Sequence, residues 1–247
     1  MAEWKPLGEM AREWGMEMTP SPHPPRADSP EGGVAADEGE EPAWERREEL
    51  GLFPSLTRTV GAVLFRTRET FSRLQLTGGL ASPLLYFVLV SSVMFAVSAF
   101  YQIAGAAANP GLFAPQLQHA PKSALYVGLI GSILLSPALY VVSAFIGSGI
   151  THLCLKLLGG AHRPFEATFR VVCYAQASAA VLNVLPLCGG LIGVIWGAWC
   201  VIIGLKEVHK TEGWRATLAL VLPGLLCCGA LALSLIHISE PTRPERI

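Results

Sequence analysis

Long apolar runs separated by short polar connections dominate the chain beyond its N-terminal third. The run from 171 to 205 contains no Asp, Glu, Lys or Arg, and it is broken once, at Pro186, Gly189 and Gly190. Because a bilayer core about 30 Å thick requires roughly 20 apolar residues of helix, this run has room for two spans and is too long for one. Proline removes a backbone donor and glycine removes side-chain bulk, so the pattern predicts a transmembrane hairpin that turns at residues 187–190.

Two further apolar runs have the length of a single span. Residues 84–103 carry no charge, and Tyr101 near their end is suited to the membrane interface. Residues 214–235 contain Pro223, which a membrane helix tolerates because neighbouring helices and local kinking satisfy the carbonyl that proline frees. Both runs are therefore predicted to be transmembrane helices.

Residues 124–158 form an apolar run that has two interpretations. A helix of this length would measure about 50 Å, too long for one perpendicular span, and Ser136 and Pro137 are expected to interrupt it. Either residues 124–135 form a short interfacial or re-entrant helix before one span at 137–158, or the run contains two short spans. Because the cytoplasmic ends of spans are enriched in Lys and Arg, we choose one span, which brings every basic cluster to the same side.

Together these runs predict an all-α fold, a polytopic helical membrane protein with about five transmembrane helices. The N-terminus is expected in the cytoplasm, because the Arg-rich segment before the first span and the basic residues beside later spans then share that side. The predicted membrane domain covers residues 80–232. Its spans lie near residues 84–103, 137–158, 170–187, 190–207 and 214–235.

Residues 44–77 precede the first span and have apolar side chains at helical spacing with basic residues between them. This pattern is typical of an amphipathic helix that lies flat in the membrane interface and favours anionic lipid. An ordinary helix packed on the membrane domain fits the pattern equally well. The predicted membrane-surface basic residues are Arg58, Arg66, Arg68 and Arg73.

Residues 1–43 are rich in proline and acidic residues and contain few branched aliphatic side chains. Such a segment cannot bury enough apolar surface to offset the entropy that ordering would cost. It also lacks the basic end and apolar core of a secretory signal peptide. We therefore expect a disordered cytoplasmic tail.

The composition agrees with a membrane protein, since 51% of the residues are hydrophobic and only 15% are charged. The net charge of -1 combines an acidic N-terminal region with an almost uncharged centre, so nucleic acid is not an expected partner. The six cysteines lie in or beside apolar runs. Their spacing does not suggest a metal site or a disulfide framework, so buried free thiols are expected.

The last residues of the chain have an unusual origin in this interpretation. Residues 233–243 read LSLIHISEPTR, and these eleven codons can be back-translated into an adaptor used in transposon-based sequencing libraries. Residues 233–247 are therefore predicted to be a sequencing artefact, which places the end of the native sequence near Ala232. The nucleotide sequence tests this prediction, because other codons at these positions would exclude the adaptor.

Glycine recurs on one face of the second helix of the hairpin. Small residues let helix backbones approach closely in lipid, where apolar burial gives no drive to associate. We predict a helix-packing seam on this face, formed with another span of the same subunit or, alternatively, with a second copy of the chain. Its residues are Gly189, Gly193, Gly197 and Gly204.

Polar side chains within the predicted spans are the first candidates for a functional role: His152, Gln176 and Asn183. Each is expected to hydrogen-bond a neighbouring helix or to line an inner crevice. Transport of a small solute is an alternative function. It has little support, because the span interiors lack the charged residues that usually mark ion or proton pathways.

The sequence contains no arrangement of residues that suits an enzyme active site. Ser148 and His152 resemble part of an intramembrane serine protease, but Ile146 stands where that arrangement has Gly. A histidine four residues along the same helix is also poorly placed to activate the serine. His152 and Cys154 supply too few ligands for a metal, and no phosphate loop or dinucleotide fingerprint is present. We therefore predict no catalytic residue, metal or cofactor.

Motifs of glycine, proline and aromatic residues lie within residues 50–232. They include Phe165, Tyr174-Ala175, Leu185-Pro186, Gly189-Gly190, Trp196 and GLKEVH at 204–209, together with LFRTRETFSRL at 64–74 and LLGGAHRP at 157–164. This set resembles the Yip family of Ypt/Rab-interacting membrane proteins, in its bacterial branch. The resemblance implies a five-span helical domain with a cytosolic N-terminal region.

Two departures limit what the resemblance implies. Thr67 stands where the family has Pro, and the Asp-Leu-Tyr-Gly-Pro type of motif is absent, so Rab binding and vesicle traffic are not carried over. We expect a non-enzymatic scaffold of the bacterial inner membrane that organises lipid or binds partners. Its expected partners are the lipid bilayer and either another copy of the chain or other membrane proteins. A small-solute transporter or channel-like protein is the alternative, and an intramembrane protease is a distant one.

Overall fold

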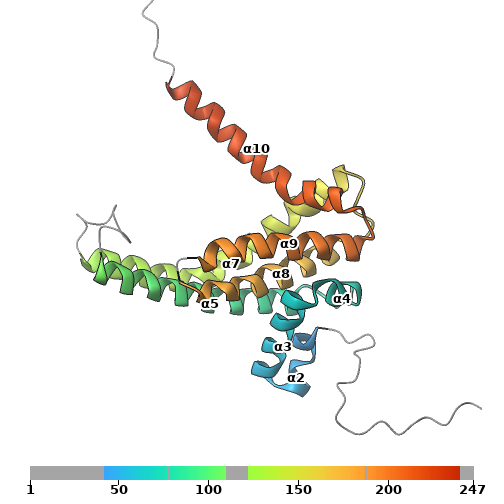
Figure 1. Ribbon diagram of the computed structural model, residues 1–247, viewed down its shortest axis with the longest axis horizontal. Helices are drawn as coiled ribbons and strands as arrows, with labels where there is room; N and C mark the ends of the chain where they lie inside the picture. Colours follow the sequence, from blue (N-terminus) through green and yellow to red (C-terminus); the bar gives the residue numbers. More distant parts are fainter. Residues whose placement is uncertain (1–41, 77, 110–121, 187, 240–247) are drawn as a thin grey trace, which may run out of the picture. The chain divides into compact units, whose positions relative to one another are not determined.

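The computed structural model describes residues 42–76, 78–109, 122–186 and 188–239. The chain divides into two units, Met1–Glu38 and Gly39–Ile247, and only the second contains described residues. The disordered tail predicted for residues 1–43 lies outside the described residues up to residue 41, so it stays a prediction. Within the described ranges all regular structure is helical (Figure 1), which confirms the all-α class.

The helices follow one another along the chain with short connections. In order they are η1 (Ala43–Arg46), α2 (Arg47–Leu50), α3 (Leu52–Phe65), α4 (Thr67–Ser72), α5 (Ala81–Ala108), α7 (Lys122–Leu157), α8 (Phe165–Ala180), η3 (Val181–Val184), α9 (Gly189–His209) and α10 (Gly213–Ser239).

Four of these helices are long and apolar enough to cross a membrane: Ala81–Gly105, Val127–Leu157, Gly189–His209 and Gly213–Leu235. Large apolar side chains on all four are exposed, as expected of surfaces that lipid covers. A polytopic helical membrane protein is therefore confirmed.

The helix α8 is the shorter first arm of the predicted hairpin. It has 16 residues, begins at Phe165 rather than near residue 170, and contains both Glu166 and Arg170. With η3 it lies alongside α9 (Figure 1), and the turn between the two arms includes Leu185, Pro186 and Cys188. Almost every side chain of α8 from Ala167 to Ala179 is buried. Because protein rather than lipid surrounds this helix, it tolerates charged and small residues that a lipid-facing span would not.

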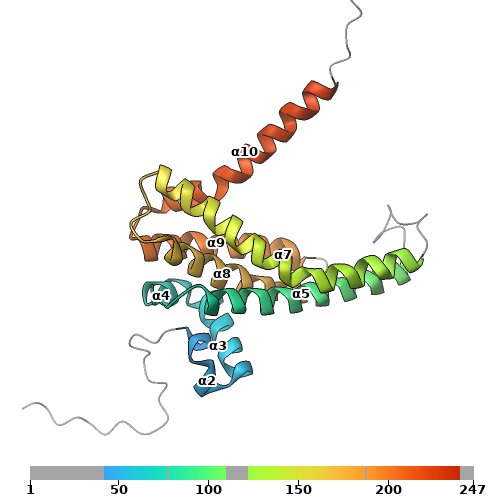
Figure 2. The same cartoon turned by 180° about the vertical axis from the view of Figure 1, so that it is seen from behind.

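The expected interruption of α7 at Ser136 and Pro137 is wrong, because the helix is continuous from Lys122 to Leu157. Proline at 137 cannot donate to the carbonyl oxygen of Ile133, and the Ser136 hydroxyl donates to that oxygen instead, at 2.8 Å. The freed acceptor is thus satisfied inside the helix. Figure 2 shows α7 changing direction along its length, lying beside α5 first and meeting α10 later.

The single amphipathic helix predicted for residues 44–77 is also wrong, because the segment folds into η1, α2, α3 and α4. Gly51 has a φ of 85°, which favours glycine and separates α2 from α3. Arg66 leaves the helical region between α3 and α4, with φ of -125°. These breaks let α3 pack on α8 while α4 packs on α9.

The cysteine prediction needs a correction as well. All six thiols are free, but only Cys154, Cys173 and Cys200 are buried, whereas Cys188, Cys227 and Cys228 are exposed. Cys227 and Cys228 lie on an exposed part of α10, and Cys188 lies in the turn before α9, so a sequence pattern alone does not distinguish them from core positions. The helix α10 continues to Ser239 and so includes part of the segment predicted to be adaptor-encoded. Helix formation does not depend on the origin of that segment.

Candidate functional site

The predicted glycine seam of α9 lies against the first arm of the hairpin. A Cβ added to Gly189 would stand 2.3 Å from the carbonyl oxygen of Leu182, and one added to Gly193 would stand 3.1 Å from that of Ala179. Gly189 has no room for a side chain, and a Cβ at Gly193 would fit only if the backbone of α8 moved by a few tenths of an ångström. The close approach of the two backbones therefore requires glycine at 189 and favours it at 193.

The same face continues towards the other end of α9. A Cβ on Gly197 would lie 3.1 Å from Gln176 Oε1, and one on Gly204 would lie 2.5 Å from the Val171 side chain and 3.1 Å from Phe71. All four predicted seam glycines are buried, and α8, η3 and α4 of the same chain cover them. Gln176 thus lies in a helix contact.

Asn183 lies at the opposite end of the hairpin from Gly204. Its side chain comes from η3 and lines a pocket of about 420 Å³ together with Ser98, Tyr101 and Gln102 of α5. The Tyr101 hydroxyl donates to the carbonyl oxygen of Val184 at 2.9 Å, which joins the end of α5 to η3. Of the three predicted polar residues, Asn183 is the one that lines a described pocket.

His152 belongs to a hydrogen-bonded chain that crosses three helices. The backbone N–H of Arg163 donates to His209 Nδ1 at 3.2 Å, so the neutral imidazole carries its proton on Nε2. That Nε2–H then donates to Thr168 Oγ1 at 2.9 Å, and the Thr168 hydroxyl donates to His152 Nδ1 at 2.8 Å. The chain links α7, α8 and α9 through the half-buried His152 and the buried Thr168 and His209, and the His152 Nδ1 is occupied by its bond to Thr168.

The protease arrangement weighed from the sequence does not form around Ser148. The Ser148 hydroxyl is buried and has no hydrogen-bond partner among the described residues, and the His152 ring bonds Thr168 instead. A serine nucleophile requires its base within hydrogen-bond reach. No group of three His, Cys, Asp or Glu side chains that could hold a metal occurs in the described part of the chain.

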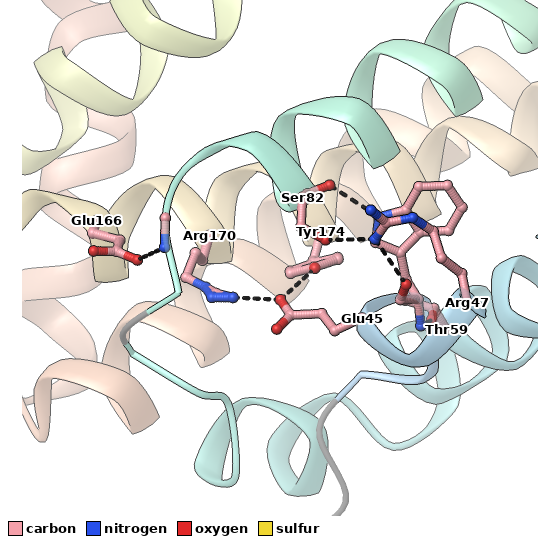
Figure 3. Close-up of polar contacts among 9 residues, drawn as sticks. Glu45, Arg47, Thr59, Ser82, Glu166, Arg170 and Tyr174 are labelled. Atoms are coloured by element: carbon pink, nitrogen blue, oxygen red, sulfur yellow. Dashed lines mark hydrogen bonds and ion pairs between the residues drawn. The ribbon is translucent and has the colours of Figure 1, made fainter. Parts of the chain in front are cut away.

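A second polar cluster joins the N-terminal segment to α8 (Figure 3). Arg170 is fully buried and forms an ion pair with Glu45 of η1. Tyr174, one turn further along α8, donates its hydroxyl to the same Glu45 oxygen at 2.7 Å. A buried guanidinium is costly unless it is paired, so Glu45 is the residue that makes Arg170 tolerable inside the fold.

Trp44 precedes Glu45 in the chain and holds η1 in place beside this ion pair. Its indole is fully buried, with its ring centroid 5.5 Å from that of Tyr86. The indole N–H donates to the carbonyl oxygen of Ser82 at 2.9 Å, and the backbone N–H of Trp44 donates to Thr59 Oγ1 at 2.8 Å. Arg47 donates to the Ser82 hydroxyl at 3.1 Å and lies over the indole ring. The short helix η1 is thereby fixed to both α3 and α5.

Two glycines shape the other side of the cluster. Gly78 and Gly79 have positive φ values of 141° and 86°, which side chains rarely adopt. A Cβ on Gly78 would lie 3.4 Å from an Arg170 nitrogen, and the backbone N–H of Gly79 donates to Glu166 at 2.7 Å. The turn before α5 is thus held against the beginning of α8.

The four predicted membrane-surface arginines do not form one stripe. Arg58, Arg66 and Arg73 are exposed at separate places on α3 and after it. Arg68 of α4 pairs with Glu207 of α9 at 2.8 Å. This arginine joins the N-terminal segment to the hairpin, a role that the amphipathic pattern did not indicate.

Sequence reasoning missed the docking of Trp44 and Glu45 altogether. The sequence pattern did not single out Arg170, although it directly precedes an uncharged apolar run within one helix. A buried arginine at such a position must find an acid, and that requirement is a usable signal. The identity of the acid is not readable, because Glu45 is 125 residues away in the chain.

Comparison with known proteins gives one family match. A family model described as the Yip1 domain matches residues 61–235. The match covers α4 to α9, the C-terminal end of α3 and most of α10, and it excludes η1 and α2. In the same comparisons no curated protein and no solved structure matches the chain.

Proposed function

Because the chain belongs to the Yip1 domain family, we propose that it is a non-enzymatic, multi-pass membrane scaffold that binds partners or organises the lipid around it. The observation that carries this proposal is the use of polar groups inside the helix bundle. His152 bonds Thr168, and Gln176 fills the space over a glycine of α9. Such groups serve helix packing, whereas a carrier needs them to face a path for its solute.

The N-terminal segment, residues 42–76, forms a platform that packs on this bundle. Glu45 and Arg68 tie it to α8 and α9 by ion pairs, and Trp44 is its fully buried anchor. Two aromatic side chains of the same segment face outward: Phe53 is 77% exposed and Phe65 is 83% exposed. Exposed aromatics on a fixed platform are suited to insertion in a membrane interface or to contact with another protein.

We place the chain in the bacterial inner membrane with its N-terminal platform in the cytoplasm. The support is the distribution of charge, since Arg58 and Arg66 lie on the platform, Arg163 lies in the connection between α7 and α8, and Lys210 lies at the end of α9. Positive charge of this kind is retained on the cytoplasmic side during insertion.

Photo-crosslinking from the platform tests the scaffold proposal in native membranes. A benzophenone amino acid would replace Phe53 or Phe65 in the full-length chain, with Ser72, an exposed polar position of α4, as the control. The proposal expects discrete adducts from Phe53 and Phe65 that Ser72 does not give. An adduct with the mass of lipid indicates membrane organisation, and one of doubled protein mass indicates a homo-oligomer. Absence of adducts from both aromatic positions contradicts the proposal.

Transport remains a second candidate because of the pocket that Asn183 lines. This pocket also contains Gln102 at the end of α5, so a small polar solute could bind there. Flux of defined solutes into proteoliposomes, with Asn183→Leu as the matched variant, separates the two functions. Flux that depends on Asn183 would overturn the scaffold proposal.

A further inference from the structure

A basic hollow lies where three membrane-crossing helices end. It has a volume of about 370 Å³ and is lined by His162, Arg163, His209 and Lys210. The first two belong to the connection between α7 and α8, and the last two belong to the end of α9 and its connection to α10. None of the four lining side chains is acidic.

Hydrogen bonds hold these two connections together and give the hollow a fixed shape. His162 Nδ1 donates to the carbonyl oxygen of His209 at 3.0 Å, because a carbonyl can only accept. The backbone N–H of Arg163 bonds the His209 ring at 3.2 Å. Arg215 of α10 donates to the carbonyl oxygen of Gly159 at 2.8 Å. The backbone is therefore fixed, while the side chains of Arg163 and Lys210 stay at the surface.

Lys210 occupies a backbone conformation that normally selects glycine. Its φ is 51°, and it is the one non-glycine residue with positive φ among the described residues. This left-handed conformation is a common way to end an α-helix, and here Lys210 is the C-cap of α9. It places a lysine at the rim of the basic hollow.

Basic side chains outnumber acidic ones around the hollow, so its net charge is positive. Residues 156–163 and 206–215 together contain five Lys or Arg and two Glu. Glu207 is shared, since it pairs with Arg68 at 2.8 Å and lies 3.7 Å from the exposed Lys210 ammonium. Glu212 bonds Trp214 and lies 4.0 Å from Arg215. Surface pairs of this length are weak, so Lys210 can exchange its partner for a stronger anion.

We propose that this hollow binds a phosphate group, that of an anionic phospholipid. The hollow lies at the ends of spans, which is the depth of lipid headgroups in a bilayer. Basic pockets between membrane helices are suited to anionic headgroups, and arginine and lysine supply charge-assisted hydrogen bonds to phosphate oxygens. The inference needs only the membrane embedding of the chain and not its role as a scaffold.

Lipid retention by the purified full-length protein tests the proposal. The protein in mild detergent would be titrated with phosphatidylglycerol or with zwitterionic phosphatidylcholine, and bound lipid counted by native mass spectrometry. The test variant combines Arg163→Gln with Lys210→Asn, because asparagine tolerates positive φ. Arg58→Gln with Arg66→Gln, which removes two exposed arginines of the platform, is the charge-matched control. Size-exclusion profiles check that each variant is folded.

The proposal expects selective retention of phosphatidylglycerol by the wild type and the control. The test variant should bind it about 25-fold more weakly, since each of the two basic residues near an anionic lipid surface contributes roughly a fivefold factor. The charge-conserving variant Arg163→Lys with Lys210→Arg should restore binding. Equal retention by the wild type and the test variant, or equal retention of phosphatidylcholine, overturns the proposal.

A separate arm identifies the source of the phosphate. Inorganic phosphate would be added to the lipid-free protein, and the midpoint of thermal unfolding measured for the wild type and the test variant. A lipid site predicts no shift at millimolar phosphate. A shift in the wild type that the test variant lacks supports the phosphate site and assigns it to a soluble anion. Failure of both arms overturns the site without affecting the scaffold proposal, which the crosslinking experiment tests.

Discussion

At the scale of single residues, two polar groups on α8 determine how this helix is attached to its surroundings. Arg170 binds the N-terminal segment through Glu45, and Thr168 joins α7 to α9 through two histidine rings. Both side chains are fully buried. Because a buried polar group left without its partner is destabilising, each of these contacts can be tested by removing one partner.

Glu45→Ala should strongly destabilise the docked N-terminal segment. The substitution leaves the Arg170 guanidinium buried and uncompensated, at a cost of about 3 kcal/mol or more in the free energy of unfolding. Chemical unfolding in detergent measures the loss, and limited proteolysis detects release of residues 42–76. Glu49→Ala is the matched control, because Glu49 pairs with Arg46 at the surface and is 69% exposed. A double variant, Glu45→Leu with Arg170→Met, should recover part of the stability.

Thr168→Val should weaken the contact of α8 with both α7 and α9. Valine has nearly the shape of threonine but removes the hydroxyl that accepts from His209 and donates to His152. The buried His209 and the half-buried His152 lose their partner, so the free energy of unfolding should fall by about 2 kcal/mol. Thr217→Val is the control, since its hydroxyl bonds only the backbone of its own helix. A loss no larger than that of the control would contradict the network.

At the scale of elements, the hairpin of α8, η3 and α9 was the most predictable feature. The absence of charge from 171 to 205 and the break at Pro186 indicated two antiparallel arms that turn near residues 187–190, and the glycine spacing indicated a packing face. Where α8 begins was less predictable, because its burial by neighbouring helices, rather than its own hydropathy, allows Arg170 inside. The helix α7 continues past Pro137 with a hydrogen bond from the Ser136 hydroxyl to the carbonyl that the proline leaves free. From the sequence alone, Pro137 suggests a break in the helix, and this hydrogen bond is not evident.

The adjacent glycines at the start of α9 provide a matched pair for the hairpin contact. Gly189→Ala would place a Cβ 2.3 Å from the carbonyl oxygen of Leu182, whereas Gly190→Ala would place one 3.7 Å from the Asn183 side chain. Both changes bring the same helix propensity gain. We therefore expect Gly189→Ala to lower the free energy of unfolding by about 1–3 kcal/mol and Gly190→Ala to leave it unchanged or raised. If Gly190→Ala lowered the free energy of unfolding more than Gly189→Ala, the close contact between Gly189 of α9 and Leu182 of η3 would be excluded.

At the scale of the whole molecule, contacts between residues far apart in the chain determine which parts lie on the same side of the membrane. Arg68 of α4 pairs with Glu207 near the end of α9, so the N-terminal segment and the basic hollow beside Lys210 share one side of the membrane. The last turns of α5 lie at the other end of the hairpin, where Tyr101 bonds Val184. From charge alone, the sequence predicted on which side of the membrane each loop lies. It could not predict the contacts of Arg68 with Glu207 and of Tyr101 with Val184, because these join residues far apart in the chain.

Cysteine labelling in intact cells tests this arrangement together with the proposed orientation. The six native cysteines would be replaced by alanine, and single cysteines introduced at the exposed positions Ser72, Lys210 and Asn109. A membrane-impermeant maleimide should modify position 109 in intact cells and positions 72 and 210 only after the membrane is opened, because basic ends of spans remain in the cytoplasm. Inversion of all three results would overturn the orientation but keep the fold. Labelling of 72 and 210 from opposite sides would contradict the contact between α4 and α9 itself.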